Sequence, residues 1–114
     1  MDSERKDKRT EKIEGSVKEI VARYIERESN KTALITVTRV ESYEHGRNAT
    51  IYISVMPESG EDSAVNFLKR MRKELREELK KRLNIRTIPF LDVAIDTGEK
   101  ARNTIDALLH EAEL

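Results

Sequence analysis

The feature that most constrains the fold is a helical repeat in residues 64–86, which are basic in an otherwise neutral chain. Apolar side chains recur there every three or four residues, at Ala64, Leu68, Met71, Leu75 and Leu79. The segment has nine Lys or Arg side chains and three acidic ones, whereas the 114-residue chain has 22 of each charge. The sequence therefore predicts one amphipathic helix that packs on a core and exposes a positive surface.

The positive charges of this helix gather on one side of its apolar stripe. At about 100° per residue, five of them share a sector that contains no acid, and we call them the basic flank: Lys69, Arg72, Lys73, Arg76 and Lys80. The three acids lie on the other side, together with Arg70 and Lys81. This segregation fits a surface for a polyanion. An ordinary solvated charged face is the alternative, because such faces are common.

The remaining patterns predict two further helices and three strands. A helical repeat covers residues 10–28, and strands are expected at residues 34–41, 49–56 and 88–96. Turn residues 44–48 join the first two strands in a hairpin. Four further apolar positions predict a short terminal helix: Ala101, Ile105, Leu108 and Ala112. The order α-β-β-α-β-α indicates a two-layer α+β domain with helices over one face of the sheet.

The first predicted strand does not reveal its buried face. Ile35 and Val37 lie on one side of an ideal strand, while Leu34 and Val40 lie on the other. The last strand is clearer, because its apolar residues alternate with polar ones. Asp92 and Asp96 fall on the polar side, so both carboxylates are expected to be solvated.

The basic helix is expected to be straight. Ser63 has the side chain of a typical N-cap. Met71, Arg72 and Lys73 favour a helix, and neither Gly nor Pro interrupts them. Because sharp kinks need an identifiable cause, we predict no bend there.

The composition argues against several classes of protein. The chain has no Cys, which excludes disulfides and thiolate metal sites. It has no apolar run near the ~18 residues that cross a bilayer, so a cytoplasmic protein without membrane contact is expected. His45 and His110 stand far apart in sequence without a catalytic motif. We expect no enzyme activity, no cofactor, no metal, no small-molecule substrate, and a monomer.

Nucleic-acid binding is the better supported chemistry. Phosphates require clustered Lys and Arg, which supply affinity without reading sequence. The basic flank and Arg86 form such a cluster, and Arg39 and Arg47 extend it. Tyr43 and Tyr52 are candidates to stack on bases. Tyr52 lies mid-strand, where packing is the commoner role.

Several strings in this order resemble the ribosome-binding factor A family. The resemblance runs from residue 13 to 109 and comprises Ile35–Glu41, Ala49–Val55, Leu75–Leu83, Ile85–Pro89, and Asp96 with Ile105–Leu109. It implies a type II KH-like fold, αββαβ, without the GxxG loop of ordinary KH domains. The four glycines here are scattered and form no GxxG. Where the family usually has an Ala-x-Gly kink, this chain reads Met71-Arg72-Lys73.

The resemblance also implies a function and an organisation. The family consists of bacterial assembly factors that bind the free immature 30S small ribosomal subunit and its 16S rRNA and assist rRNA maturation. We expect a flexible charged leader at residues 1–9, a KH-like domain at 10–98 and a C-terminal helix or tail at 99–114. The alternative is a non-ribosomal interaction module whose basic helix binds an acidic protein. A steep salt dependence of RNA binding would separate the two.

Overall fold

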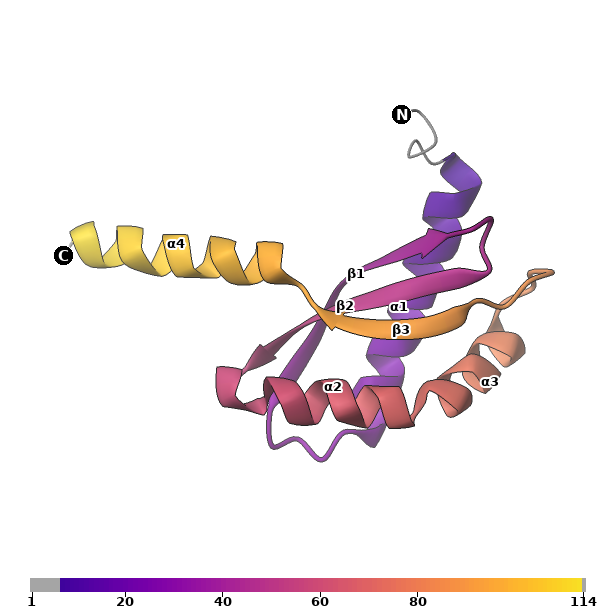
Figure 1. The fold of residues 1–114 in the computed structure, drawn as a ribbon, viewed down its shortest axis with the longest axis horizontal. Helices are drawn as coiled ribbons and strands as arrows, with labels where there is room; N and C mark the ends of the chain where they lie inside the picture. Colours follow the sequence, from indigo (N-terminus) through magenta and orange to yellow (C-terminus); the bar gives the residue numbers. More distant parts are fainter. Residues whose placement is uncertain (1–6, 114) are drawn as a thin grey trace.

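The computed structural model describes residues 7–113 and confirms the two-layer α+β architecture (Figure 1). Its elements are α1 (Lys8–Glu28), β1 (Leu34–Tyr43), β2 (Asn48–Met56), the 3-10 turn η2 (Glu58–Gly60), α2 (Glu61–Arg70), α3 (Arg72–Arg82), β3 (Phe90–Ile95) and α4 (Thr97–Glu113). The expected leader at 1–9 falls largely outside the described residues. Within them, Asp7 caps α1, because its side chain accepts a hydrogen bond from the backbone N–H of Thr10 at 2.8 Å.

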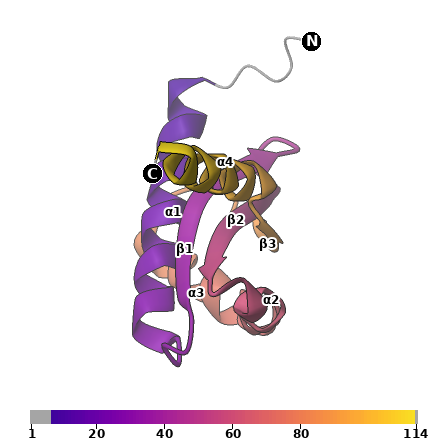
Figure 2. The same ribbon diagram turned by 90° about the vertical axis from the view of Figure 1, so that its left-hand side faces the viewer.

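The three strands form one sheet in the order β1–β2–β3. β1 and β2 are antiparallel, as the predicted hairpin requires, whereas β2 and β3 run parallel. The α2–α3 segment makes the crossover that a parallel pair needs. In Figures 1 and 2, α1 lies along one face of the sheet, and no helix of residues 7–113 covers the opposite face.

A β-bulge at Thr38 resolves the uncertain face of β1. Val37 pairs with Ile53 and Arg39 with Tyr52, so Thr38 is the extra residue in the ladder. The extra residue reverses the alternation after it. Val37 and Val40, which an ideal strand would place on opposite faces, are therefore both buried in the core.

The core lies between the sheet and the helical layer. Ile51 and Ile53 of β2 are fully buried, as the clean alternation of that strand predicted. α1 packs on β1 through a face that buries Val17 and Val21. α2 packs on β3 and β2, and α3 packs on α1 and β3. Side chains from α1, α2 and α3 therefore cover the inner face of β2, the central strand.

The prediction of one straight basic helix is wrong, because the helix is interrupted at Met71. There the backbone has φ −90° and ψ 4°, and α2 and α3 leave it in different directions (Figure 1). Leu68 is buried under α2 and Leu75 under α3. Both helices pack on β3, but α2 also packs on β2, whereas α3 also packs on α1. Packing thus overrides the local helix propensity. The Nε of Arg72 donates to the carbonyl of Lys69 at 3.1 Å, which satisfies an acceptor at the end of α2.

Other boundaries differ from those expected. Ser63 is not the N-cap, because η2 leads directly into α2 at Gly60 and the helix begins at Glu61. The predicted basic helix ends at Arg82, four residues before its expected end. α4 is longer than predicted, at 17 residues. It extends away from the sheet, and its residues 101–110 are all exposed (Figures 1 and 2).

Two leucines test this division between core and surface. Leu75→Ala removes a fully buried side chain and should lower the free energy of unfolding by about 3 kcal/mol. Leu108→Ala on α4 changes a side chain that is 60% exposed and should alter stability by less than about 0.5 kcal/mol. Urea denaturation of both variants measures the difference. Equal losses would contradict the assignment of α4 to the surface.

Candidate nucleic-acid interface

The first part of the basic flank lies beside β3 and faces an acid that the helix pattern did not predict. Lys69 Nζ and Arg72 Nη1 lie 3.9 and 3.8 Å from Oδ1 of Asp92. The same oxygen accepts a hydrogen bond from the backbone N–H of Val93 at 2.8 Å. The helical repeat shows no acid in this sector because Asp92 arrives from a strand. Its side chain is more than half exposed, as the strand pattern predicted.

Arg76 is half-buried and anchors the backbone that leads into β3. Its Nε donates to the carbonyl of Pro89 at 3.1 Å, and its Nη2 donates to the carbonyl of Ile88 at 2.9 Å. The guanidinium carbon lies 4.2 Å from the centre of the Phe90 ring. The helix pattern placed Arg76 among solvated cations, whereas the structure gives it a supporting role. It is a weaker candidate for a phosphate ligand than its neighbours.

The cations most accessible to a ligand lie further along α3 and in the adjacent loops. Within residues 7–113, the side chains of Lys73, Arg47 and Arg86 are exposed and make no hydrogen bond or ion pair. Lys80 contacts only Glu77, at 3.3 Å, among the described residues. The carbonyl of Arg47 accepts a hydrogen bond from the N–H of Phe90 at 2.8 Å. This bond places the hairpin turn next to the start of β3.

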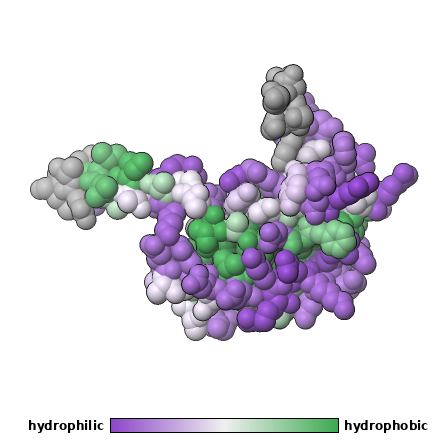
Figure 3. Space-filling model, in the orientation of Figure 1, coloured by the Kyte–Doolittle hydropathy of each residue, from purple (hydrophilic) through white to green (hydrophobic). Residues whose placement is uncertain are grey.

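An apolar strip accompanies these cations. Figure 3 shows hydrophobic surface along β3, bordered by hydrophilic side chains. Phe90 is 63% exposed, and Ala94 and Ile95 are half-buried. Phe90 was not among the residues predicted from sequence, although an aromatic on the polar side of a strand was a visible signal. Cations beside exposed apolar and aromatic groups suit single-stranded nucleic acid, since phosphates need charge and bases need surfaces for stacking.

Arg39, expected to extend the basic surface, is held by partners on the uncovered face of the sheet. Its Nε lies 3.3 Å from Oδ2 of Asp96, and it also pairs with Glu41. Its guanidinium carbon lies 3.8 Å from the centre of the Tyr52 ring. One face of the half-buried Tyr52 ring is therefore occupied. Neither residue is as available to RNA as the sequence indicated.

The expectation of a solvated Asp96 is wrong, because the side chain is 4% exposed. It accepts hydrogen bonds from Thr38 Oγ1 at 2.5 Å and from the N–H of Glu99 at 3.0 Å. The bond from Thr38, then that from Glu99, holds the pKa of Asp96 below its ordinary value. Asp96 directly follows β3. Its side chain faces the β1 bulge at Thr38 and not water. It caps the first turn of α4.

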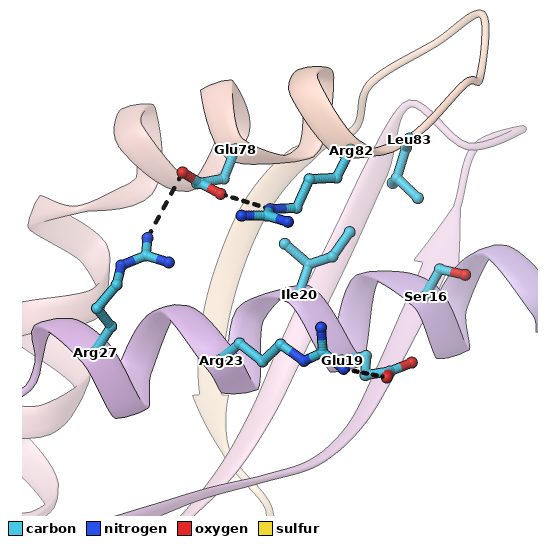
Figure 4. Close-up of a pocket in the computed structure, with 8 residues that line it drawn as sticks. All are labelled: Ser16, Glu19, Ile20, Arg23, Arg27, Glu78, Arg82 and Leu83. Carbon is cyan, nitrogen blue, oxygen red and sulfur yellow. Dashed lines mark hydrogen bonds and ion pairs between the residues drawn. The ribbon is translucent and has the colours of Figure 1, made fainter.

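A groove of about 340 Å³ lies between α1 and α3, away from β3 (Figure 4). Glu78 contacts Arg82 at 3.0 Å and Arg27 at 3.6 Å, and Arg23 contacts Glu19 at 3.1 Å. The bond from Arg82 holds the pKa of Glu78 below its usual range. Each guanidinium thus has a carboxylate partner, and we interpret the groove as a polar joint between helices. Its lining comprises Ser16, Glu19, Ile20, Arg23, Arg27, Glu78, Arg82 and Leu83.

Two other kinds of site, a metal centre and a membrane-spanning helix, have no support in the part of the chain that the structure describes. None of its His, Asp and Glu side chains form a group of three placed to hold a metal ion. His45 lies in the exposed hairpin turn and His110 on α4. None of the helices in residues 7–113 combines the length and apolar character needed to cross a membrane.

Comparison with known proteins establishes the family. The sequence model of ribosome-binding factor A matches residues 7–109, which include all three strands and most of the helical residues. The chain belongs to the ribosome-binding factor A family. It is 36% identical to ribosome-binding factor A of Heliobacterium modesticaldum over 84 residues, which cover 73% of this chain and 69% of that protein.

Solved structures of the family share the fold. The crystal structure of ribosome-binding factor A from Thermus thermophilus matches with a TM-score of 0.68 at 24% identity, covering 75% of this chain and 93% of that one. The solution structure of a putative ribosome-binding factor A from Thermotoga maritima matches with a TM-score of 0.64 at 21% identity, covering 80% and 90%. A Thermus thermophilus homology model, fitted to a map of a 30S complex, matches with a TM-score of 0.63 at 24% identity, covering 75% and 92%. The expected KH-like fold is confirmed.

The supporting role of Arg76 gives a stability prediction. Arg76→Gln removes two hydrogen bonds to loop carbonyls and should lower the free energy of unfolding by about 1–2 kcal/mol. Lys73→Gln, on the same helix but at a side chain without a described partner, should change it by less than about 0.5 kcal/mol. Chemical denaturation of both variants tests this. If the two behave alike, Arg76 is an ordinary surface cation.

The cap at Asp96 gives a pH prediction. Asp96→Ala should cost about 2 kcal/mol at pH 7, because a buried acceptor and a helix cap are lost. A lowered pKa means that this contribution is complete above the ordinary value of 3.8 and is lost as the pH falls through the folded-state value. Denaturation from pH 7 to pH 3 should therefore show the two proteins converging below pH 3.8. A difference that is independent of pH would contradict the ionised cap.

Proposed function

We propose that this chain binds the free small ribosomal subunit by laying the β3 side of the domain on 16S rRNA. The observation that carries the proposal is the row of exposed cations beside an apolar strip, in a member of the ribosome-binding factor A family. A homology model of the related Thermus thermophilus factor has been fitted into the map of a complex of that factor with the 30S subunit. The alternative is a basic helix that binds an acidic protein, and the salt-dependence experiment below separates it from RNA binding.

The residues on the β3 side of the domain have different roles in binding. Phosphates are contacted by Lys69, Arg72, Lys73 and Lys80. Arg47 and Arg86 extend this contact. Arg76 holds the backbone before β3 in place and lies over one face of the Phe90 ring. The exposed part of this ring stacks on an unpaired base. The ion pairs to Asp92 are long and partly exposed. Exchanging these ion pairs for phosphate contacts costs little free energy, because exposed ion pairs contribute only about 0–1 kcal/mol to stability.

Maturation of the rRNA follows from this binding without cleavage by the protein itself. The proposed surface consists of cations, an aromatic ring and a strand edge, which position RNA but do not activate a nucleophile. We propose that the chain holds a segment of immature rRNA in one conformation, in the cytoplasm, until the subunit matures. Processing would then be carried out by other enzymes on the particle.

Salt dependence tests this proposal. A variant with Gln at Lys69, Arg72, Lys73 and Lys80 retains Arg76 and should remain folded, since Gln, Lys and Arg have similar helix propensities. Binding to 16S rRNA and to small subunits should weaken, and the slope of log K against log salt should fall by roughly one unit per lost contact. Fluorescence anisotropy across a salt series measures both quantities.

A matched control removes the same charge elsewhere on the surface. Gln at four other exposed cations that make no side-chain hydrogen bond or ion pair among the described residues should leave the slope nearly unchanged: Lys12, Lys18, Arg70 and Lys81. Equal losses in the two variants would mean that affinity follows net charge and not the basic flank. Binding to an acidic protein but not to RNA would favour the alternative function.

A further inference from the structure

The base of α4 is held in one orientation by contacts with two parts of the domain. Asp96 caps the helix at the N–H of Glu99 and is itself bonded to Thr38 of the β1 bulge. On the same first turn, Lys100 Nζ lies 2.9 Å from Glu58 and 3.2 Å from Glu61. The helix therefore leaves the domain in a direction set by β1, η2 and α2.

Beyond this anchored turn, α4 carries an apolar stripe that faces solvent. Ile105, Leu108 and Leu109 are 55%, 60% and 59% exposed. At about 100° per residue they lie within one third of the helix circumference. An amphipathic helix with anchors at i, i+3 and i+4 is the form that binds in an apolar groove of another protein. Figure 3 shows this hydrophobic surface separated from the strip on β3.

The charge of this helix indicates what kind of partner it takes. By sequence, residues 103–113 contain Asp106, Glu111 and Glu113 but no Lys or Arg. In Figure 1, α4 leaves from the opposite end of the sheet to α3, which carries most of the basic flank. The two ends of the domain therefore differ in charge. Phosphates would be repelled by the far half of α4, whereas a basic protein would be attracted.

We propose that α4 is a docking arm for a basic protein with an apolar groove, present on the same particle that the basic flank binds. This inference rests on the proposed function, because the particle must contain protein as well as RNA. A second copy that packs its own stripe against this one fits less well, because the acidic far halves of the two helices would repel each other.

The experiment compares binding to whole small subunits with binding to the rRNA extracted from them. The test variant combines Ile105→Ala, Leu108→Ala and Leu109→Ala, which remove the stripe but keep helix propensity. The control combines Asn103→Ala and His110→Ala, at exposed positions on the opposite side of α4. The test variant should bind subunits about tenfold more weakly or worse, with unchanged affinity for the extracted rRNA. The control should match the unaltered chain in both assays.

Each other outcome has a distinct meaning. Unchanged binding of the test variant to subunits overturns the docking arm alone. Equal losses on subunits and on extracted rRNA also overturn it, because α4 would then act on RNA. If the unaltered chain sediments as a dimer and the test variant as a monomer, the occupant is a second copy and the proposal is wrong. If the unaltered chain does not bind subunits at all, the proposed function fails, and this inference fails with it.

Discussion

The structure depends above all on the burial of the inner face of β2 beneath the helical layer. Ile51 and Ile53 are fully buried there, and removal of their apolar surface from water is the main favourable term in folding. This burial fixes the register of β2 and therefore which side chains of β1 and β3 face the helices. It also explains the break at Met71. The chain must cover β2 and β3 with α2, and then turn so that Leu75 and Leu79 of α3 reach α1 and β3.

The same packing sorts the cations of the basic helix into different roles. Arg72 satisfies a helix carbonyl at the break, and Arg76 secures the backbone before β3. Lys73 is exposed and accessible to a ligand, since no described group forms a hydrogen bond or ion pair with it. Residues that look equivalent on a helical wheel thus differ in function, because each meets a different neighbour. The segregation of charge along the helix indicates the proposed binding surface, and local contacts decide which of its cations are free to bind.

The domain has two ends with different chemistry. The α3 end presents cations together with the hairpin turn at Arg47, while the α4 end presents an apolar stripe in a segment whose charged residues are acidic. At the α4 end, Asp96 joins the bulge of β1 to the first turn of α4. The bulge that changes the alternation of β1 therefore also sets the direction of a projecting helix. Such an arrangement suits a particle that contains both RNA and protein.

The sequence by itself determined the order of elements, apart from the break in the basic helix, and the buried faces of β2 and β3, because these follow from residue periods of 2 and 3.6. The basic flank stays a prediction. The sequence also carried the family resemblance, which the family model bears out. Tertiary structure decided the break at Met71, the bulge at Thr38, the burial of Asp96 and the pairing of Lys69 and Arg72 with Asp92. Each of these depends on which distant segment lies opposite a residue. Local periodicity contains no information about that neighbour, so only the folded chain reveals it.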